Sequence, residues 1–147
     1  MHAFIKFNQG MMKMSTPVRG WLLSLITVNL VVPLFFLERL EAQVVVGTLF
    51  ISMMLMTGLT ALTGFTRLLG LGHVLWIPML FWLWTTLDEI PANDVFGIWV
   101  RALMVLNAIS LVIDAVDVGR YLAGNREEVV KNLDTAVVSI VAREVKR

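Results

Sequence analysis

Five polar residues recur at helical spacing toward the end of the chain's last long apolar stretch. They are Asn107, Ser110, Asp114, Asp117 and Tyr121, separated by steps of three, four, three and four residues. Residues with this spacing share one face of an α-helix. A carboxylate is costly in lipid, and inside a membrane span it usually faces a bundle interior or a water-filled cavity. These five residues, called the polar stripe below, are therefore the first candidate for a functional site.

Three residues outside the stripe are expected near its charged end. Counting the helical rise inward from the ends of the apolar stretches places His73 at a depth similar to that of Asp114. Arg67 and Arg120 flank the same level, one from a loop and one from a helix end. The sequence thus predicts a cluster of carboxylate, imidazole and guanidinium groups near one membrane surface.

This cluster permits two kinds of chemistry. A histidine beside a carboxylate can titrate between about pH 5 and 8, so His73, Asp114 and Asp117 form a candidate proton or ion site. The alternative, which we favour from the sequence, is a structural latch in which Arg67 or Arg120 neutralises Asp117. No spacing of histidine and acidic residues indicates a catalytic constellation, a metal site or a cofactor site.

The elements that carry these residues follow from composition. Of the 147 residues, 58% are hydrophobic and 16% are charged, and the mean hydropathy is +0.80, whereas soluble domains are about half apolar and about a quarter charged. Each of four apolar stretches is long enough to cross a hydrocarbon core as a helix. The fold class predicted is an all-α integral membrane protein with transmembrane helices at about 20–37, 43–64, 70–87 and 95–118.

Orientation follows from the basic residues, because Lys and Arg in short loops resist translocation. In the two connections after the first and third stretches, nearly all charged residues are acidic. Both termini and the connection around Arg67 are therefore predicted to be cytoplasmic, in an up-down-up-down bundle of a cell inner membrane. The basic residues on that side are Lys6, Lys13, Arg19, Arg67, Arg120, Arg126, Lys131, Arg143, Lys146 and Arg147.

Two asparagines, Asn29 and Asn107, are expected near the middle of the membrane, where amide side chains commonly join helices. A hydrogen bond between them would link the first and fourth helices. Pro33 and Pro78 lack an amide hydrogen, so each predicts a kink in its helix.

Small and charged residues suggest further helix contacts. Thr57, Thr60 and Gly64 form a small, polar seam on the second helix that leads to Arg67. Arg101 lies nearly opposite the polar stripe on the fourth helix. We expect it either to reach outward toward acidic residues or to contact another subunit.

The sequence divides into three parts, namely a basic segment at 1–19, the transmembrane domain at 20–118 and a cytoplasmic tail at 119–147. The tail predicts an amphipathic helix that either lies on the lipid surface or packs against protein. The formal net charge of +1 gives no reason to expect nucleic acid as a partner.

Three functions remain open from the sequence. The first is a small, non-enzymatic assembly or accessory protein that self-associates in the bilayer or binds another membrane protein. The second is a channel or transporter that moves protons, cations or a small solute past Asp114, Asp117 and His73. The third is a membrane enzyme that acts on a lipophilic substrate.

Overall fold

The described part of the chain is a bundle of four apolar spans. The computed structural model describes residue 9, residues 12–125 and residue 127, and within these it contains helices and no strand. Each span is long and apolar enough to cross a membrane, which confirms the predicted all-helical class with four helices able to span a bilayer. The spans are Thr16–Phe36, Leu40–Thr63, Arg67–Glu89 and Val95–Leu122.

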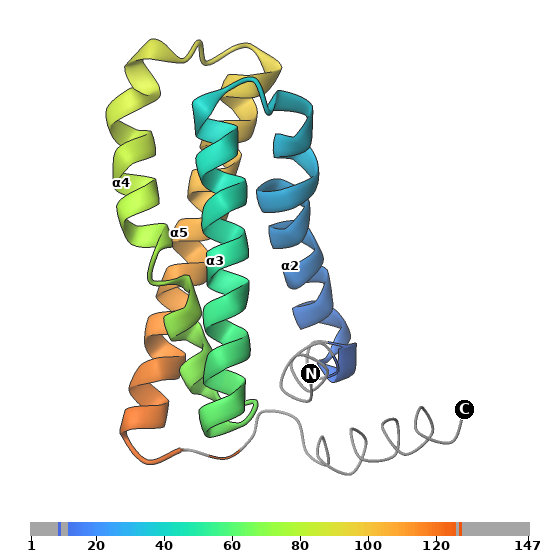
Figure 1. Ribbon diagram of the computed structural model, residues 1–147, viewed down its shortest axis with the longest axis vertical. Helices are drawn as coiled ribbons and strands as arrows, with labels where there is room; N and C mark the ends of the chain where they lie inside the picture. The colour runs from blue at the N-terminus through green and yellow to red at the C-terminus, as the bar shows by residue number, and fades with distance from the viewer. Residues whose placement is uncertain (1–8, 10–11, 126, 128–147) are drawn as a thin grey trace, which may run out of the picture.

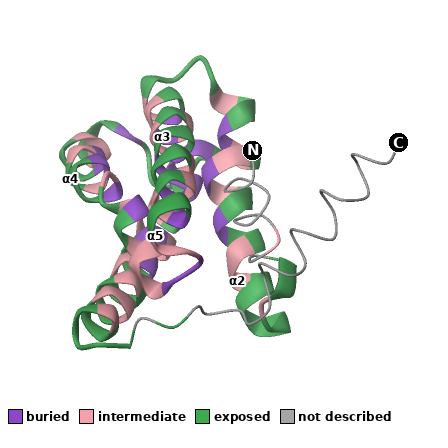
Figure 2. Cartoon of the chain, turned by 60° about the horizontal axis from the view of Figure 1, so that its bottom comes forward, coloured by how far each residue is buried: buried purple, intermediate pink, exposed green. Residues whose placement is uncertain are grey.

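The spans lie side by side (Figure 1). The connections that follow the first and third spans lie at one end of the bundle, and the connection between the second and third spans lies at the other. Buried positions cluster on the sides of the helices that face one another, while the outward sides are exposed (Figure 2). The core is largely aliphatic at its centre, with Val45 of the second span, Leu83 of the third and Leu103 of the fourth fully buried.

The first span changes its helical geometry twice. It consists of the α-helix α2 (Thr16–Ile26), the π-helical turn η1 (Thr27–Val31) and the 3-10 helix η2 (Val32–Phe36). In the π-turn, the amide of Val32 donates to the carbonyl of Thr27. An α-helix would direct that amide to the carbonyl of Val28, which is therefore left available to another donor.

The second span is a single α-helix, α3 (Leu40–Thr63). It ends at Gly64, whose positive φ of 75° is a conformation that glycine adopts readily. The fourth span is also one α-helix, α5 (Val95–Leu122), so it continues four residues beyond its predicted end. Residues 128–147, where the amphipathic tail helix was predicted, lie outside the described residues.

The third span is not one α-helix, and its interruption lies just before Pro78, where the sequence predicted a kink in the helix at 70–87. It begins as the 3-10 helix η3 (Arg67–His73), turns, continues as α4 (Trp76–Thr86) and ends in η4 (Leu87–Glu89). Pro78 contributes to the break, because it has no amide for the carbonyl of Val74. That carbonyl instead accepts from the amide of Ile77 at 3.2 Å.

Two glycines let η3 lie close to its neighbours. A Cβ atom on Gly70 would stand 2.9 Å from Cβ of Asp114 in α5, and one on Gly72 would collide with the side chain of Met56 in α3. The first half of the third span is therefore wedged between α3 and α5 at distances that larger residues would not permit.

Polar contacts hold the start of α5 in place. Asp94 caps the helix by accepting the amide of Gly97 at 2.5 Å. The guanidinium of Arg101 donates to the carbonyls of Gly97, Ile90 and Leu87 at 3.1, 3.2 and 3.5 Å. Arg101 thus reaches toward the expected end of the bundle, but its partners are backbone carbonyls of its own chain and not the acidic side chains expected there.

Gly97 provides a test of this packing. Its added Cβ would collide with the carbonyl of Pro91, so Gly97→Ala is expected to lower the free energy of unfolding by about 2 kcal/mol, a usual cost of overpacking. The measurement is unfolding of the full chain in detergent micelles. Gly20→Ala is the matched control, because nothing lies within 4 Å of its added Cβ. Equal effects of the two substitutions would contradict the close approach.

Candidate functional site

The polar stripe starts at a pair of buried amides. Asn29 of η1 and Asn107 of α5 have exposed fractions of 1% and 0%. Each side chain donates to the other at 2.8 Å, and Asn29 also donates to the carbonyl of Leu25 at 2.9 Å. The interhelical bond considered from the sequence is therefore present, and it joins the first span to the fourth in both directions.

A second contact between the same spans lies beside this pair. The indole nitrogen of Trp99 donates to the carbonyl of Val28 at 2.8 Å, which is the carbonyl that the π-turn leaves available. Sequence reasoning missed this contact. A signal was present, because Trp99, Leu103 and Asn107 follow one another at steps of four residues and extend the buried face of α5.

His73 and Asp114 form the next contact along the stripe. Nδ1 of His73 lies 2.8 Å from Oδ2 of Asp114, and the two side chains are 14% and 19% exposed. The imidazole also stacks on Trp76, with ring centroids 4.1 Å apart. Because Gly70 has no side chain, η3 approaches the backbone of α5 at Asp114 and brings the histidine within reach.

Arg67 and Asp117 form an ion pair nearer the end of the bundle. Nη1 of Arg67 donates to Oδ1 of Asp117 at 2.9 Å, with side-chain exposures of 26% and 34%. Of the two arginines predicted as partners, only Arg67 takes this role within the described part of the chain, and Arg120 is exposed. The two pairs hold the beginning and the end of η3 against α5.

The remaining predicted residues are less directly involved. Ser110 is buried between Asn107 and Asp114, and Tyr121 is half-buried at the end of α5. The hydroxyls of Thr57 and Thr60 bond to carbonyls of their own helix, those of Met53 and Met56. Gly64 serves to end α3. The predicted seam therefore supplies no hydroxyl-mediated bond between helices at Thr57 or Thr60.

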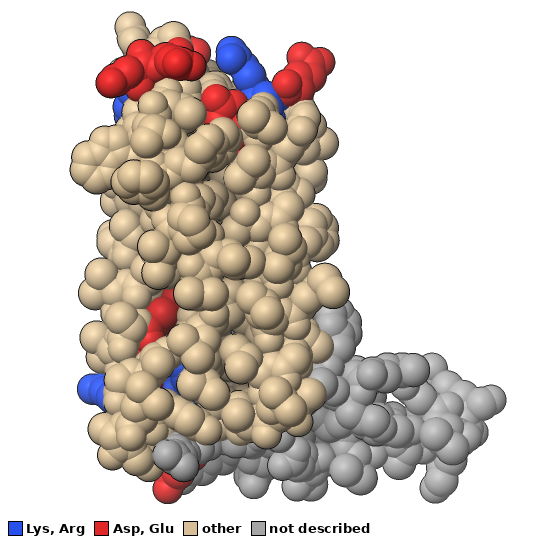
Figure 3. Space-filling model, turned by 60° about the vertical axis from the view of Figure 1, so that its left-hand side comes forward, with Lys and Arg blue, Asp and Glu red and all other residues tan. Residues whose placement is uncertain are grey.

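The surface reflects this gradient from buried amide to partly exposed charge. Figure 3 shows acidic and basic atoms gathered at one end, an uncharged middle, and a small acidic area with basic atoms beside it low on the face shown. Asp114, Asp117 and Glu127 are the acidic residues described in that half of the bundle. Among the described residues, no group of three or more histidine and acidic side chains could hold a metal ion.

Comparison with models of protein families, with curated protein sequences and with solved structures found no match.

The amide pair can be tested with a double-mutant cycle. Asn29→Leu or Asn107→Leu leaves the other amide buried without its partner, so each substitution is expected to be destabilising. The double variant is expected to lose less free energy of unfolding than the two single variants lose together, with a coupling free energy of about 1 kcal/mol. Unfolding in detergent micelles gives the free energy for each single variant and for the double variant. Asn93→Leu, in the exposed connection before α5, is the control. Additive effects would show that the two amides do not interact.

Proposed function

We propose that the protein is a small, non-enzymatic, multi-pass protein of a cell inner membrane that serves as an assembly or accessory component. One observation carries the proposal. The amide and both carboxylates of the polar stripe each bond to a side chain of another span in the same chain, namely Asn29, His73 and Arg67. Side chains that bond to one another between spans are suited to holding those helices together.

Solvation of the two carboxylates distinguishes a latch from a conducting site. Carboxylates that conduct ions must exchange their partners for water or for the ion itself. Asp114 and Asp117 instead have a histidine and an arginine at hydrogen-bond distance. Separating either carboxylate from its partner leaves a partly buried charge without compensation, which is destabilising. This favours a latch over a conducting site.

The proposed orientation places the ends of η3 and α5 that carry Arg67 and Arg120 in the cytoplasm, together with both termini. Lys13 precedes the first span and Arg19 lies in its first turn, at the same end. The charged residues of the opposite helix ends and connections are mostly acidic, namely Glu38, Glu41, Asp88, Glu89 and Asp94 beside the single basic Arg39. This distribution supports the orientation through the preference of basic residues for the cytoplasmic side.

Self-association within the bilayer, or binding to another membrane protein, is part of the proposal. Gly47 and Gly58 of α3 are exposed, and nothing lies within 4 Å of a Cβ added to either. Exposed small residues let the backbone of another helix approach closely. This supports a contact between spans of different chains along α3.

A second candidate function is transport of protons, cations or a small solute. It is favoured by the break in the third span, which lies directly after His73. Discontinuous helices surround the substrate and ion sites of many transporters. Under this alternative, Asp114, Asp117 and His73 would exchange their present partners during transport.

Reconstitution into liposomes separates these two functions. Vesicles with the full chain and a pH or cation-sensitive dye are expected to leak no faster than empty vesicles, because the carboxylates are paired. Asp114→Asn and Asp117→Asn are then expected to leave the leak unchanged, as is the control Asp88→Asn at the opposite end. A flux that exceeds that of empty vesicles and falls in either stripe variant, but not in Asp88→Asn, would establish transport and overturn the proposal.

The fastening itself is tested by exchanging charges. Arg67→Asp and Asp117→Arg are each expected to lower the free energy of unfolding by roughly 1 kcal/mol, given the partial exposure of the pair. The double variant restores opposite charges and is expected to recover most of this loss in micelles. A double variant as unstable as the sum of the singles would show that the pair does not fasten η3 to α5.

A further inference from the structure

Two polar groups in the centre of the bundle have no hydrogen-bond partner among the described residues. They are Oγ of Ser52 in α3 and Nε1 of Trp76 at the start of α4. Ser52 is 0% exposed and Trp76 is 2% exposed. Leaving a buried donor without a partner is expensive, and most such groups in native proteins bond to protein or to ordered water.

Counting residues from a contact between the two spans places Ser52 and Trp76 at a similar height in the bundle. Gly72 of η3 lies against Met56 of α3, and the two spans run in opposite directions (Figure 1). Moving four residues away from this contact leads to Trp76 on one span and to Ser52 on the other. Their immediate neighbours confirm that these turns face each other, because Ile51 and Leu75 line the same groove.

Comparable side chains elsewhere in the bundle do have hydrogen-bond partners. The hydroxyls of Thr57, Thr60 and Thr63 on α3 each donate to the carbonyl four residues earlier, whereas the hydroxyl of Ser52 makes no such bond. Trp99, the other buried tryptophan, donates to the carbonyl of Val28. Trp76 stacks on His73 through its ring, which leaves its N–H without an acceptor.

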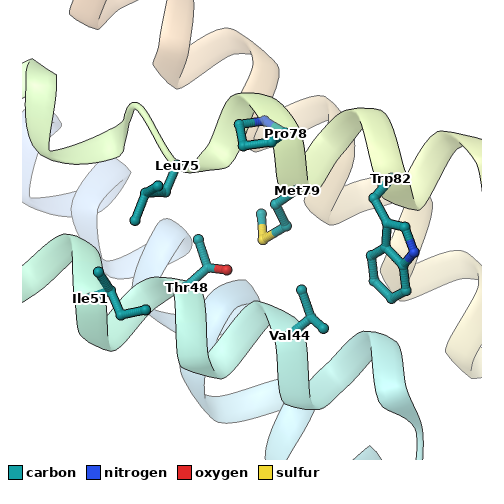
Figure 4. Close-up of a pocket in the computed structure, with 7 residues that line it drawn as sticks. All are labelled: Val44, Thr48, Ile51, Leu75, Pro78, Met79 and Trp82. Atoms are coloured by element: carbon teal, nitrogen blue, oxygen red, sulfur yellow. The ribbon is translucent and has the colours of Figure 1, made fainter.

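The helices do not close completely at this level. A groove of about 300 Å³ lies between α3 and α4, with Thr48 and Ile51 on one side and Leu75 and Met79 on the other (Figure 4). Val44 of α3 and Pro78 and Trp82 of α4 complete its lining. Ile51 and Leu75, which line the groove, are the sequence neighbours of Ser52 and Trp76, so the groove lies beside the two unpartnered groups.

We propose that Ser52 and Trp76 form an internal hydration site, in which ordered water accepts a hydrogen bond from Nε1 of Trp76 and bonds to Oγ of Ser52. An indole N–H only donates, so the occupant must supply an acceptor atom, while a hydroxyl either donates or accepts. Water meets both requirements, and buried water typically makes two to four such bonds. The hydrocarbon chain of a lipid meets neither.

This site would add a water-mediated link between α3 and the third span. The inference depends on Ser52 and Trp76 alone, and it holds whether the polar stripe is a latch or a transport site.

The effect of Ser52→Ala on stability has opposite signs for a hydrated and an unbonded hydroxyl. If water bonds to Ser52, its removal raises the unfolding equilibrium constant of the full chain in micelles, by about fivefold for one typical hydrogen bond. If the hydroxyl is buried without a partner, its removal lowers that constant. Ser24→Ala is the control, because this exposed serine bonds only to its own helix and its loss is expected to change the constant less than about twofold.

Nuclear magnetic resonance identifies the occupant directly. With tryptophan indoles labelled with nitrogen-15, the Trp76 signal is assigned by its loss in Trp76→Phe, and its indole proton is expected to show magnetisation transfer from water. Trp99 is the internal control, because its indole is bonded to a carbonyl and is expected to show none. Absence of water contact at Trp76, contact with lipid or detergent protons instead, or a stabilising Ser52→Ala would each overturn the proposal.

Discussion

The reciprocal bond between Asn29 and Asn107 is the interaction on which the arrangement of the spans depends. Two amides buried at the centre of an apolar bundle have no water to bond to, so leaving either without a partner is costly. Satisfying both at once requires the first and fourth spans to adopt one rotation and one relative height. The indole of Trp99 donates to the carbonyl of Val28, which directly precedes Asn29 on the first span. This bond requires the same alignment of the two spans.

Irregular helix geometry supplies the groups that make these contacts. The π-turn of the first span withdraws an amide from Val28, and the freed carbonyl becomes the acceptor for Trp99. The 3-10 helix at the start of the third span, with glycine at its closest approaches, brings His73 and Arg67 to the carboxylates of α5. Departures from the α-helix are thus the means by which polar groups find partners away from water.

The polar stripe changes in character along its length for a related reason. An uncharged amide pair occupies the fully buried centre, where a charge would be most expensive, and the ion pair with Arg67 lies where a quarter or more of each side chain is exposed. His73 and Asp114 lie between these two environments. This gradient matches the cost of desolvation at each level, and it is consistent with a role in holding η3 and α5 together.

The sequence by itself determined the class of the protein, the number of spans and the polar face of α5, because these follow from hydropathy, length and helical periodicity, which are properties of consecutive residues. It also limited the expected partners of Asp117 to Arg67, Arg120 and His73. Only the tertiary structure decided between them, broke the third span after His73, and brought Trp99 to Val28. Those outcomes depend on the rotation and height of one helix relative to another, which are set by close packing and by the geometry of each hydrogen bond, and no pattern within a single segment contains them.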